Sequence, residues 1–396
     1  MSEVVNIKVI GVGGAGNNVV SRMMVSGVSG ITCININTDK PILLASGADE
    51  RLQIGERITH GQGAGSRLEI GRQAAEEDRT AISKLLEGTD ALFLTAGMGG
   101  GTGTGAIPVV AEIAQEMGIL TIAVVSTPFR WEGARKMRTA EAGIAELKEK
   151  VDTLFIIPNE NIRKVSDTKI SFAEAFSVSD EILNRAVTGI VDLLRSTGFI
   201  NLDFADLKAI LRESGVAHLG IASASGKDKV ITAAEQVIKS ELTGTGIENA
   251  RRIIANLTVS PELEMDEVTG LMERIQELAH PDVNMIFGLG YDETLTDALR
   301  IIVIATDFAE PEPKPEPRRR EIRPEPQREP APKPAVQPEL RPVTQTKVQP
   351  EPQPKAQSAE PPKETNRAER SSKKGNNPKV DENWEGWFKK YFGDDE

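Results

Sequence analysis

Short apolar runs alternate with amphipathic segments throughout the first half of the chain. Runs of strand length lie at residues 6–10, 31–36, 90–94, 119–125 and 153–157. Segments of helical length separate them, at residues 17–25, 68–86, 108–117 and 133–148. The run at 119–125 is almost entirely aliphatic, as expected for a strand that is buried on both faces. This alternation predicts an α/β domain built on a doubly wound parallel sheet.

The pattern changes after residue 177. Apolar residues at helical spacing over 178–194 predict one long central helix. Beyond it, four apolar runs are accompanied by only two helical segments, a balance typical of an α+β domain with a mixed sheet. The runs lie at 219–222, 252–259, 285–289 and 299–305, and the helices near 230–239 and 266–279. We therefore place a first domain at residues 1–177, the central helix and a following loop at 178–204, and a second domain at 205–308.

Composition changes again at residue 309. Residues 309–380 hold 17 of the chain's 23 prolines, together with 16 basic and 11 acidic residues. A segment so rich in proline and charge cannot bury enough apolar surface to offset the entropy that is lost on ordering. We expect it to be a disordered tether between the folded domains and residues 381–396.

Residues 381–396 predict an amphipathic helix. Five aromatic residues recur there at helical spacing: Trp384, Trp387, Phe388, Tyr391 and Phe392. Because this short segment has no core of its own, we interpret it as a docking peptide that enters a groove of a partner protein. Direct binding to a membrane surface is the alternative, although six acidic residues beside the aromatic ones disfavour anionic lipid.

Charge and apolar content narrow the class of protein. The net charge of the chain is −12. Residues 309–380 carry +5 and residues 381–396 carry −4, so the first 308 residues carry −13. So acidic a surface disfavours nucleic acid as a partner. The chain shows neither a leader-like start nor an apolar run of about 18 residues, so we expect a cytoplasmic protein without a transmembrane segment. The single cysteine, Cys33, lies in an apolar run and is interpreted as a small buried residue rather than a reactive thiol.

A glycine-rich segment at residues 11–16 lies between the first strand and the first helix. It matches the dinucleotide fingerprint G-x-G-x-x-G, and Asp39 follows the next strand where a ribose contact would be expected. Glycines allow a backbone to approach phosphate closely, and the start of a helix offers free N–H groups. Alone, this match is weak, because structural turns also use such glycines.

The glycines at residues 97–105 are a stronger signal. Six glycines in nine residues carry a conformational-entropy cost that a simple turn does not require. A second phosphate loop suits a nucleoside triphosphate. The third stretch, residues 61–65, is either a mobile loop near the terminal phosphate or a plain connection. No G-x-x-x-x-G-K-[ST] motif occurs, so backbone amides and hydroxyls must hold the phosphates, with Mg²⁺ as the default ion.

The sequence G-G-G-T-G-T-G at residues 99–105 resembles the signature of the tubulin/FtsZ family, and the likeness extends through nearly all of residues 6–308. Further matches are N-T-D at 37–39, P-F and E-G within 128–133, I-P-N at 157–159 and N-L-D-F-A-D at 201–206. The resemblance implies a GTPase that binds GTP or GDP with Mg²⁺ and polymerises head to tail into a homopolymer. It further implies a role in bacterial septation, in the ring at the mid-cell division site beneath the membrane. Membrane-tethering or regulatory division proteins are the expected partners of the tail, although the tail lacks the family's usual D-I-P-x-F-L ending.

The resemblance also implies which residues bind the nucleotide. The first phosphate loop would comprise Gly14, Ala15, Gly16, Asn17 and Asn18, and the second Gly101, Thr102 and Gly103. Glu132 and Lys136 would face the ribose, with Arg135 as an alternative to Lys136, which stands where the family usually has Arg. Asn159 and Asp180 would contact the guanine base. Phe176 either stacks on that base or belongs to the core.

The same resemblance assigns hydrolysis to Asn201, Asp203 and Asp206. From the local sequence alone, Asp203 and Asp206 also fit the start of a helix, as its N-cap and a first-turn acid. Two carboxylates beside a γ-phosphate in one resting site would repel it. The resemblance implies that they arrive from the adjacent subunit, where they would orient and polarise the attacking water.

Two other functions remain open on these motifs. A nicotinamide-dependent oxidoreductase would explain residues 11–16 and Asp39, but neither residues 97–105 nor residues 201–206. A filament-forming GTPase of the same family could instead act in plasmid segregation or membrane remodelling. A nucleotide-preference assay would distinguish the oxidoreductase from a GTPase. Loss of septa on depletion would distinguish a division protein from a filament with another role.

Overall fold

The computed structural model describes residues 5–28, 30–161, 171–195, 199–200, 202–240, 242–243 and 245–308. Asn201 and the predicted tether and docking peptide lie outside the described residues. Among the described residues, no helix combines the length and the apolar composition that crossing a membrane requires.

The first domain is built on a seven-stranded parallel sheet with the strand order β3-β2-β1-β4-β5-β6-β7. Its strands are β1 (Ile7–Val12), β2 (Thr32–Asn37), β3 (Glu50–Gln53), β4 (Ala91–Gly97), β5 (Leu120–Thr127), β6 (Thr153–Pro158) and β7 (Gly215–Val216). The five strands in the middle of this order match the five predicted apolar runs. The two edge strands were not predicted, because β3 is polar and largely exposed and β7 has only two residues.

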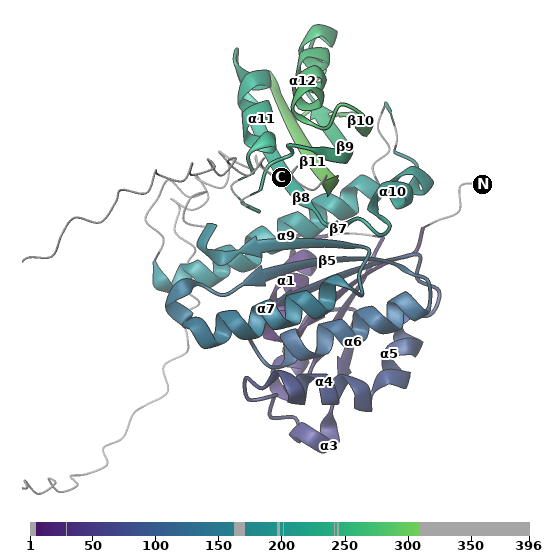
Figure 1. Ribbon diagram of the computed structural model, residues 1–396, viewed down its shortest axis with the longest axis vertical. Helices are drawn as coiled ribbons and strands as arrows, with labels where there is room; N and C mark the ends of the chain where they lie inside the picture. The colour runs from purple at the N-terminus through teal and green to yellow at the C-terminus, as the bar shows by residue number, and fades with distance from the viewer. Residues whose placement is uncertain are drawn as a thin grey trace, which may run out of the picture. The chain divides into compact units, whose positions relative to one another are not determined.

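Successive side chains of the central strands point to opposite faces of the sheet. Val9 and Phe93 belong to one apolar cluster, whereas Ile10 and Leu94 belong to another. The first cluster is covered by α1 (Gly13–Val25) and α9 (Phe172–Arg195), as Figure 1 shows. Helices α4 (Leu68–Glu77), α5 (Arg79–Leu86), α6 (Thr102–Glu116) and α7 (Ala134–Lys148) cover the second. The predicted doubly wound α/β fold is thereby confirmed.

Several predicted helices differ from the observed ones at their ends. The segment predicted as one helix over 68–86 forms two, α4 and α5, which meet at Asp78. The Asp78 carboxylate accepts a hydrogen bond from the backbone N–H of Gly55 at 2.7 Å. Short elements complete the domain: α2 (Lys40–Leu44), α3 (Glu56–Thr59) and the 3₁₀ turns η1 (Arg130–Glu132) and η2 (Asn159–Asn161).

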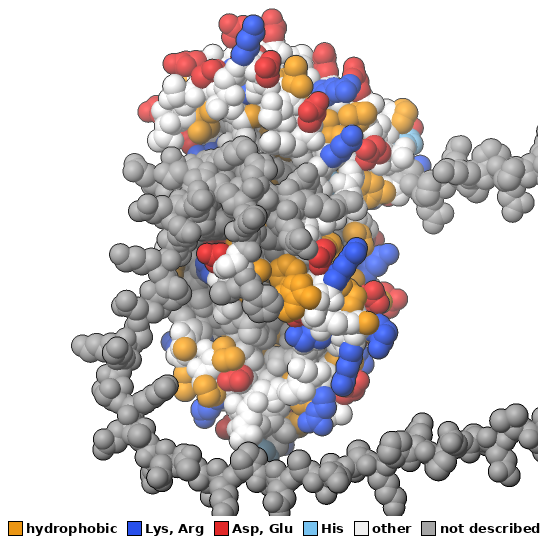
Figure 2. Space-filling view, turned by 90° about the vertical axis from the view of Figure 1, so that its left-hand side faces the viewer, with side chains coloured by type: hydrophobic (Ala, Val, Ile, Leu, Met, Phe, Trp, Pro, Cys, Tyr) orange, Lys and Arg blue, Asp and Glu red, His pale blue; other side chains and the backbone are white. Residues whose placement is uncertain are grey.

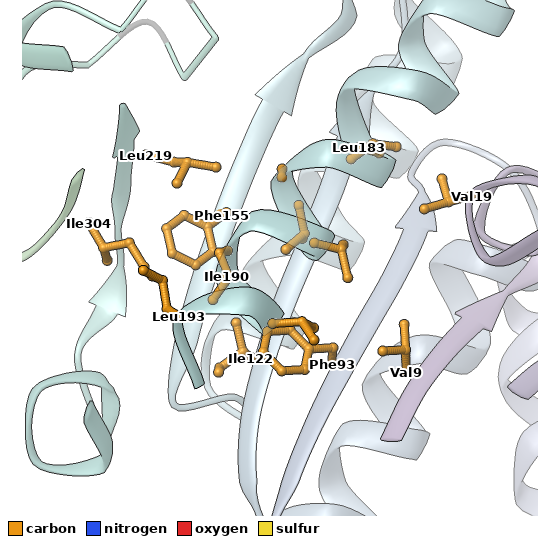
Figure 3. Close-up of a cluster of buried hydrophobic side chains, with 14 of the residues drawn as sticks. Val9, Val19, Phe93, Ile122, Phe155, Leu183, Ile190, Leu193, Leu219 and Ile304 are labelled. Atoms are coloured by element: carbon orange, nitrogen blue, oxygen red, sulfur yellow. The ribbon is translucent and has the colours of Figure 1, made fainter. Parts of the chain in front are cut away.

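Helix α9 is the central helix that the sequence predicts, and it begins six residues earlier than expected. Its apolar side chains pack against the sheet on one side and against the second domain on the other. Figure 3 shows Ile190 beside Phe155, and Leu193 extending toward Ile304. A helix of 24 residues spans about 36 Å at 1.5 Å per residue.

The second domain has a four-stranded mixed sheet with the order β10-β9-β11-β8, as predicted for an α+β domain. Strands β10 and β9 are parallel, and β11 is antiparallel to both β9 and β8. Its elements are α10 (Phe204–Leu211), β8 (His218–Ser225), α11 (Lys229–Ile238), β9 (Ala250–Val259), α12 (Met265–Leu278), β10 (Asn284–Tyr291) and β11 (Ala298–Phe308). Strand β10 is an edge strand, so its outer side is not paired within the four-stranded sheet. Leu289 on that side pairs with Ile200, in the loop that follows α9.

Candidate nucleotide site and hydrolytic loop

The first glycine segment is the junction of β1 and α1, and the helix begins within it at Gly13. Gly13 has a positive φ of 73°, and a Cβ atom there would lie 2.8 Å from the backbone nitrogen of Gly103. The two predicted phosphate loops therefore contact each other. No side chain caps α1, so its first N–H groups are open to a ligand. Gly14 is exposed, and a Cβ atom there would contact nothing within 4 Å.

The second glycine segment is the junction of β4 and α6. Helix α6 begins at Thr102, six residues before the predicted start, and no side chain caps it. A Cβ atom on Gly105 would clash with the carbonyl oxygen of Leu68, and one on Gly101 would lie 2.8 Å from the Cβ of Ala64. These glycines are thus required for packing against α4 and residues 64–67, and their number is not explained by phosphate binding alone.

The threonines of this segment differ in their surroundings. Thr104 is buried, and its Oγ1 accepts a hydrogen bond from the Gly99 N–H at 2.8 Å. The hydroxyls of Thr102 and Thr38 lie 2.6 Å apart. The Thr38 carbonyl also accepts a hydrogen bond from the Gly63 N–H at 3.3 Å, which holds the third glycine stretch beside the second. Of the two interpretations of residues 61–65, this position favours a loop near the terminal phosphate.

Asn17 and Asn18 are adjacent in sequence but have different roles. The buried Asn17 amide donates to the Gly11 carbonyl at 2.7 Å, and its Oδ1 accepts from the Asn37 amide at 2.7 Å. The Asn17 side chain therefore fixes the junction of β1, β2 and α1. The exposed Asn18 donates from Nδ2 to the Asp180 carboxylate at 3.1 Å, which links α1 to α9.

Asp180 lies in the third turn of α9 with 8% of its surface exposed. Burial raises the pKa of its carboxyl group to about 6, against the opposing effects of the Asn18 hydrogen bond and the Arg22 charge. Next to it, the Ser179 hydroxyl donates to Oδ1 of the buried Asn159 at 2.6 Å. Asn159 thus contacts the residue that precedes Asp180 in α9. At neutral pH the Asp180 carboxylate can accept two hydrogen bonds from neighbouring donors of a purine.

Both carboxylate oxygens of Glu132 have partners within the chain. Its Oε1 accepts from the backbone N–H of Phe129 at 2.9 Å, and its Oε2 forms an ion pair with Lys136 at 3.0 Å. The pair lies at i and i+4, across the start of α7. Of the two basic residues considered, Lys136 is therefore the partner of Glu132, and Arg135 is exposed beside it.

Three aromatic rings meet beside these residues. The rings of Phe129 and Trp131 are stacked, with centroids 5.2 Å apart and planes inclined by 15°. Phe176 contacts both edge-on, at 5.7 Å. Phe129 is buried, but 51% of Trp131 and 42% of Phe176 are exposed. Phe176 is thus not a core residue, and one helical turn separates it from Asp180. The sequence analysis missed Trp131, although it directly precedes Glu132.

Asp203 and Asp206 lie at the other end of α9. Asp203 caps α10, with its Oδ1 accepting from the Ala205 N–H at 3.3 Å, and Asp206 lies in the first turn; both are exposed. From Asp180 to the end of α9 at Arg195 is about 22 Å along the helix. The structure therefore does not bring these two acids together with the predicted base-binding residues of the same chain.

Strand β10 holds the loop that carries these acids. Ile200 and Leu289 exchange two backbone hydrogen bonds of 3.0 Å. Leu202 is buried, and a Cβ atom on Gly288 would lie 3.1 Å from the Cγ of Leu202. The loop is thus fixed on either side of Asn201 by the edge of the second domain's sheet.

Asp39 and Cys33 both have structural surroundings. Asp39 caps α2, with Oδ1 accepting from the Ile42 N–H at 3.2 Å, so a structural role accounts for it without a ribose. Cys33 is buried, and burial followed by the charge of Asp49 raises the pKa of its thiol to about 12, as befits an unreactive core cysteine.

Comparison with known proteins gives a consistent result along the chain. Residues 6–167 match the model of the Tubulin/FtsZ family, GTPase domain, and residues 215–309 match that of the FtsZ family, C-terminal domain. An FtsZ dimer structure from M. jannaschii is 36% identical, covers 76% of this chain and 88% of its own, and has a TM-score of 0.72. A tryptophan-to-tyrosine mutant of the same FtsZ is also 36% identical, with 77% and 91% coverage and a TM-score of 0.72.

CetZ2 from Haloferax volcanii shares the fold at 21% identity, with a TM-score of 0.64 over 77% of this chain and 95% of its own. Two matched domains in the right order, a relative at 36% identity over most of its length, and paired glycine-rich helix starts lead to one conclusion. The chain belongs to the tubulin/FtsZ family and is a GTPase.

Proposed function

We propose that this protein polymerises head to tail and that each GTP is hydrolysed at the junction between two copies. The observation that carries the proposal is the separation of two groups of residues by α9. Asp180 lies near the start of that helix, and Asp203 and Asp206 follow its end. A group that acts on the attacking water must lie within hydrogen-bond reach of it, directly or through one further water. Acids about 22 Å farther along the helix reach a nucleotide only if it belongs to another copy.

Each bound nucleotide would be held along the starts of α1, α6 and α9. Residues 14–18 and 101–103 form the phosphate loops, in which the free backbone N–H groups of the first turns of α1 and α6 bind the phosphates. Glu132 and Lys136 face the ribose, and Asn159 and Asp180 contact the guanine. Guanine suits Asp180, because N1–H and the 2-amino group can both donate to one carboxylate. Phe176 offers a partly exposed aromatic face beside that edge.

Mg²⁺ fits this site as a companion of the nucleotide. Among the described residues, no group of three His, Cys, Asp or Glu side chains could hold a metal ion. The hydroxyls of Thr38 and Thr102 supply oxygen atoms beside the phosphate loops. Mg²⁺ commonly binds through phosphates, a few protein oxygens and water, and it would supply charge neutralisation at the γ-phosphate.

The acids of the next copy would complete the site. Asp203 and Asp206 orient and polarise the attacking water, and Asn201 helps to place it. A contact between different surfaces of identical copies does not close on itself, so it propagates into a filament. The FtsZ relative from M. jannaschii, whose structure is described as a dimer, supports self-association.

We further propose that the filament forms the division ring of a bacterium, in the cytoplasm beneath the mid-cell membrane. Residues 381–396 would dock onto membrane-tethering or regulatory proteins at that site, with residues 309–380 as the tether. A filament with another role, in segregation or membrane remodelling, is the alternative. Depletion in cells separates the two, since loss of septa is expected only for a division protein.

GTP turnover should be measured against protein concentration, with sedimentation of the same samples. Wild-type activity per molecule should rise above a critical concentration. Asp206→Ala should bind GTP and pellet but lose 10²–10³-fold in rate, roughly the effect of removing one stabilising group. Asp266→Ala, which removes an exposed acid from the first turn of α12, is the matched control and should behave as wild type. Activity that is independent of concentration, with normal hydrolysis by Asp206→Ala, would contradict the proposal.

A further inference from the structure

Exposed aromatic side chains gather at two places on the described part of the chain. The nucleotide-side patch comprises Trp131 and Phe176, which are 51% and 42% exposed and contact each other edge-on at 5.7 Å. The loop-side patch comprises Phe199 and Tyr291, which are 75% and 55% exposed, with ring centroids 6.0 Å apart. Ile200 and Phe287, beside the loop-side patch, are also exposed, at 36% and 40%. On the face drawn in Figure 2, orange hydrophobic side chains lie open to solvent, with blue Lys and Arg side chains beside them.

The two patches belong to opposite ends of α9. Phe176 lies in its first turns, whereas Phe199 follows its last residue, Arg195. From Phe176 to Arg195 is about 28 Å along the helix. One copy therefore cannot bring its own two patches together. Each patch also adjoins one half of the proposed divided site, since Glu132 follows Trp131 and Asp203 lies four residues after Phe199.

The charges around the two patches are of opposite sign. Residues 130–138 contain four basic residues and one acidic residue, and Arg130, Arg135, Lys136 and Arg138 are all exposed. The segments 199–206 and 287–294 contain four acidic residues and no Lys or Arg. One of these acids, Asp292, lies 3.7 Å from Arg300 of β11, and the exposed Asp203, Asp206 and Glu293 accompany it. An aromatic patch with a basic border and another with an acidic border are complementary surfaces.

We propose that the loop-side patch of one copy packs against the nucleotide-side patch of the next, so that Phe199 and Tyr291 meet Trp131. The occupant of each patch is thus a second copy of this chain. This aromatic contact rests on the proposed head-to-tail assembly and names the side chains that hold the junction. Aromatic residues in the desolvated centre of an interface contribute most of its binding energy, and charges at its border steer association.

Cysteine cross-linking tests the contact directly, because the native Cys33 is buried and unreactive. A Trp131→Cys/Phe199→Cys chain lacks two of the proposed contact side chains, so it is assembled with GTP at more than ten times the wild-type critical concentration, and pelleting is confirmed first. Treated with a short bismaleimide, the assembled chain should yield a ladder of covalent oligomers. A mixture of the two single variants should yield covalent dimers and nothing longer, since each such pair offers one reactive junction. The control pair Ile231→Cys/Phe199→Cys uses a residue of α11 that is 62% exposed and should give neither product.

A second measurement does not depend on cysteine chemistry. Phe199→Ala/Tyr291→Ala should bind GTP as wild type does, yet its critical concentration for pelleting should rise at least tenfold. Ile231→Ala should leave both quantities unchanged.

The outcomes separate this contact from the assembly on which it rests. If the double-cysteine chain pellets but gives no ladder above its control, or if Phe199→Ala/Tyr291→Ala pellets at the wild-type critical concentration, the aromatic contact is wrong and head-to-tail assembly stands. If wild type neither pellets nor shows concentration-dependent turnover, the assembly itself is wrong, and the contact with it. A synthetic peptide of residues 381–396 that binds wild type but not an otherwise normally assembling Phe199→Ala/Tyr291→Ala chain would instead identify the tail as the occupant.

Discussion

The ionisation of Asp180 makes the stability of the nucleotide-free protein depend on pH. Burial raises its pKa to about 6 in the folded state, above the usual 3.9 of an unfolded chain. Between these values the folded state binds more protons, so its contribution to stability grows as the pH falls from 7 toward 4. We expect the free energy of unfolding of wild type to gain on the order of 2 kcal/mol relative to Asp180→Asn between pH 7.5 and 4.5. Urea denaturation at several pH values measures this difference, and parallel curves for the two chains would contradict it.

Nucleotide binding should respond to the same proton in the opposite direction. The neutral carboxyl group cannot accept from both donors on the guanine edge, so GDP affinity should fall below about pH 6 by up to tenfold per pH unit. Equilibrium dialysis with GDP tests this expectation. Asp180→Asn should bind weakly at every pH and show no such dependence.

Substitutions of the neighbouring Asn17 and Asn18 should affect different properties, stability at the first position and nucleotide binding at the second. Asn17→Ala removes a buried amide and leaves the Gly11 carbonyl and the Asn37 amide without their partner. Each buried unsatisfied group costs about 1–3 kcal/mol, so we expect a loss of roughly 3 kcal/mol in unfolding free energy. Asn18→Ala, in the exposed position next to it, should cost less than about 1 kcal/mol and chiefly weaken nucleotide binding. Thermal unfolding and GDP binding of both variants check the contrast.

At the scale of elements, the glycines of the two helix starts are not equivalent. Ala at Gly105 would place its Cβ against the Leu68 carbonyl and 2.7 Å from the Arg72 nitrogen. Separating α6 from α4 should cost about 3 kcal/mol or more. Gly14→Ala meets nothing within 4 Å and should leave the melting temperature unchanged, while the added methyl group reduces nucleotide affinity. Melting curves and GDP titrations of both variants test this contrast. A stable Gly105→Ala chain with weakened GDP binding, together with a destabilised Gly14→Ala chain, would contradict it.

The sequence predicted the buried elements well, because their apolar periodicity reflects the burial that stabilises them. It missed β3, whose exposed edge position requires no apolar residues, and it placed the start of α6 six residues late. Glycine is a poor helix former in isolation, yet here close packing between helices outweighs that propensity. The tertiary contact overrides the local preference.

The candidate site was predicted through family motifs rather than through contacts. The hydrogen bond between Asn18 and Asp180 joins residues 162 positions apart, and no local pattern specifies such a pair. The separation of Asp203 and Asp206 from Asp180 follows only from the length and placement of α9 in the fold. Trp131 was missed because a single exposed aromatic residue has no periodic signal.

At the scale of the whole molecule, the second domain should control hydrolysis through β10. A Cβ atom on Gly288 would lie 2.5 Å from the Asn256 Oδ1 and 3.1 Å from the Leu202 Cγ. Gly288→Ala should therefore displace Leu202 and the acids that follow it. We expect GTP turnover in assembled samples to fall at least tenfold while the affinity of the unassembled chain for GDP is unchanged. Gly270→Ala, with open space around its Cβ position, is the control.

The length of α9 has a consequence for the ends of a filament. If a copy cannot reach its own nucleotide, a row of n copies contains n−1 complete sites, and one terminal copy keeps its GTP intact. That end would carry a permanent triphosphate marker, renewed with each added copy, while older junctions behind it convert to GDP. Short rows would hydrolyse less per copy than long ones, and a pair would work at half capacity. Because α9 keeps the acids of a copy away from its own nucleotide, turnover per copy would depend on filament length, and the nucleotide at each junction would reflect the age of that junction.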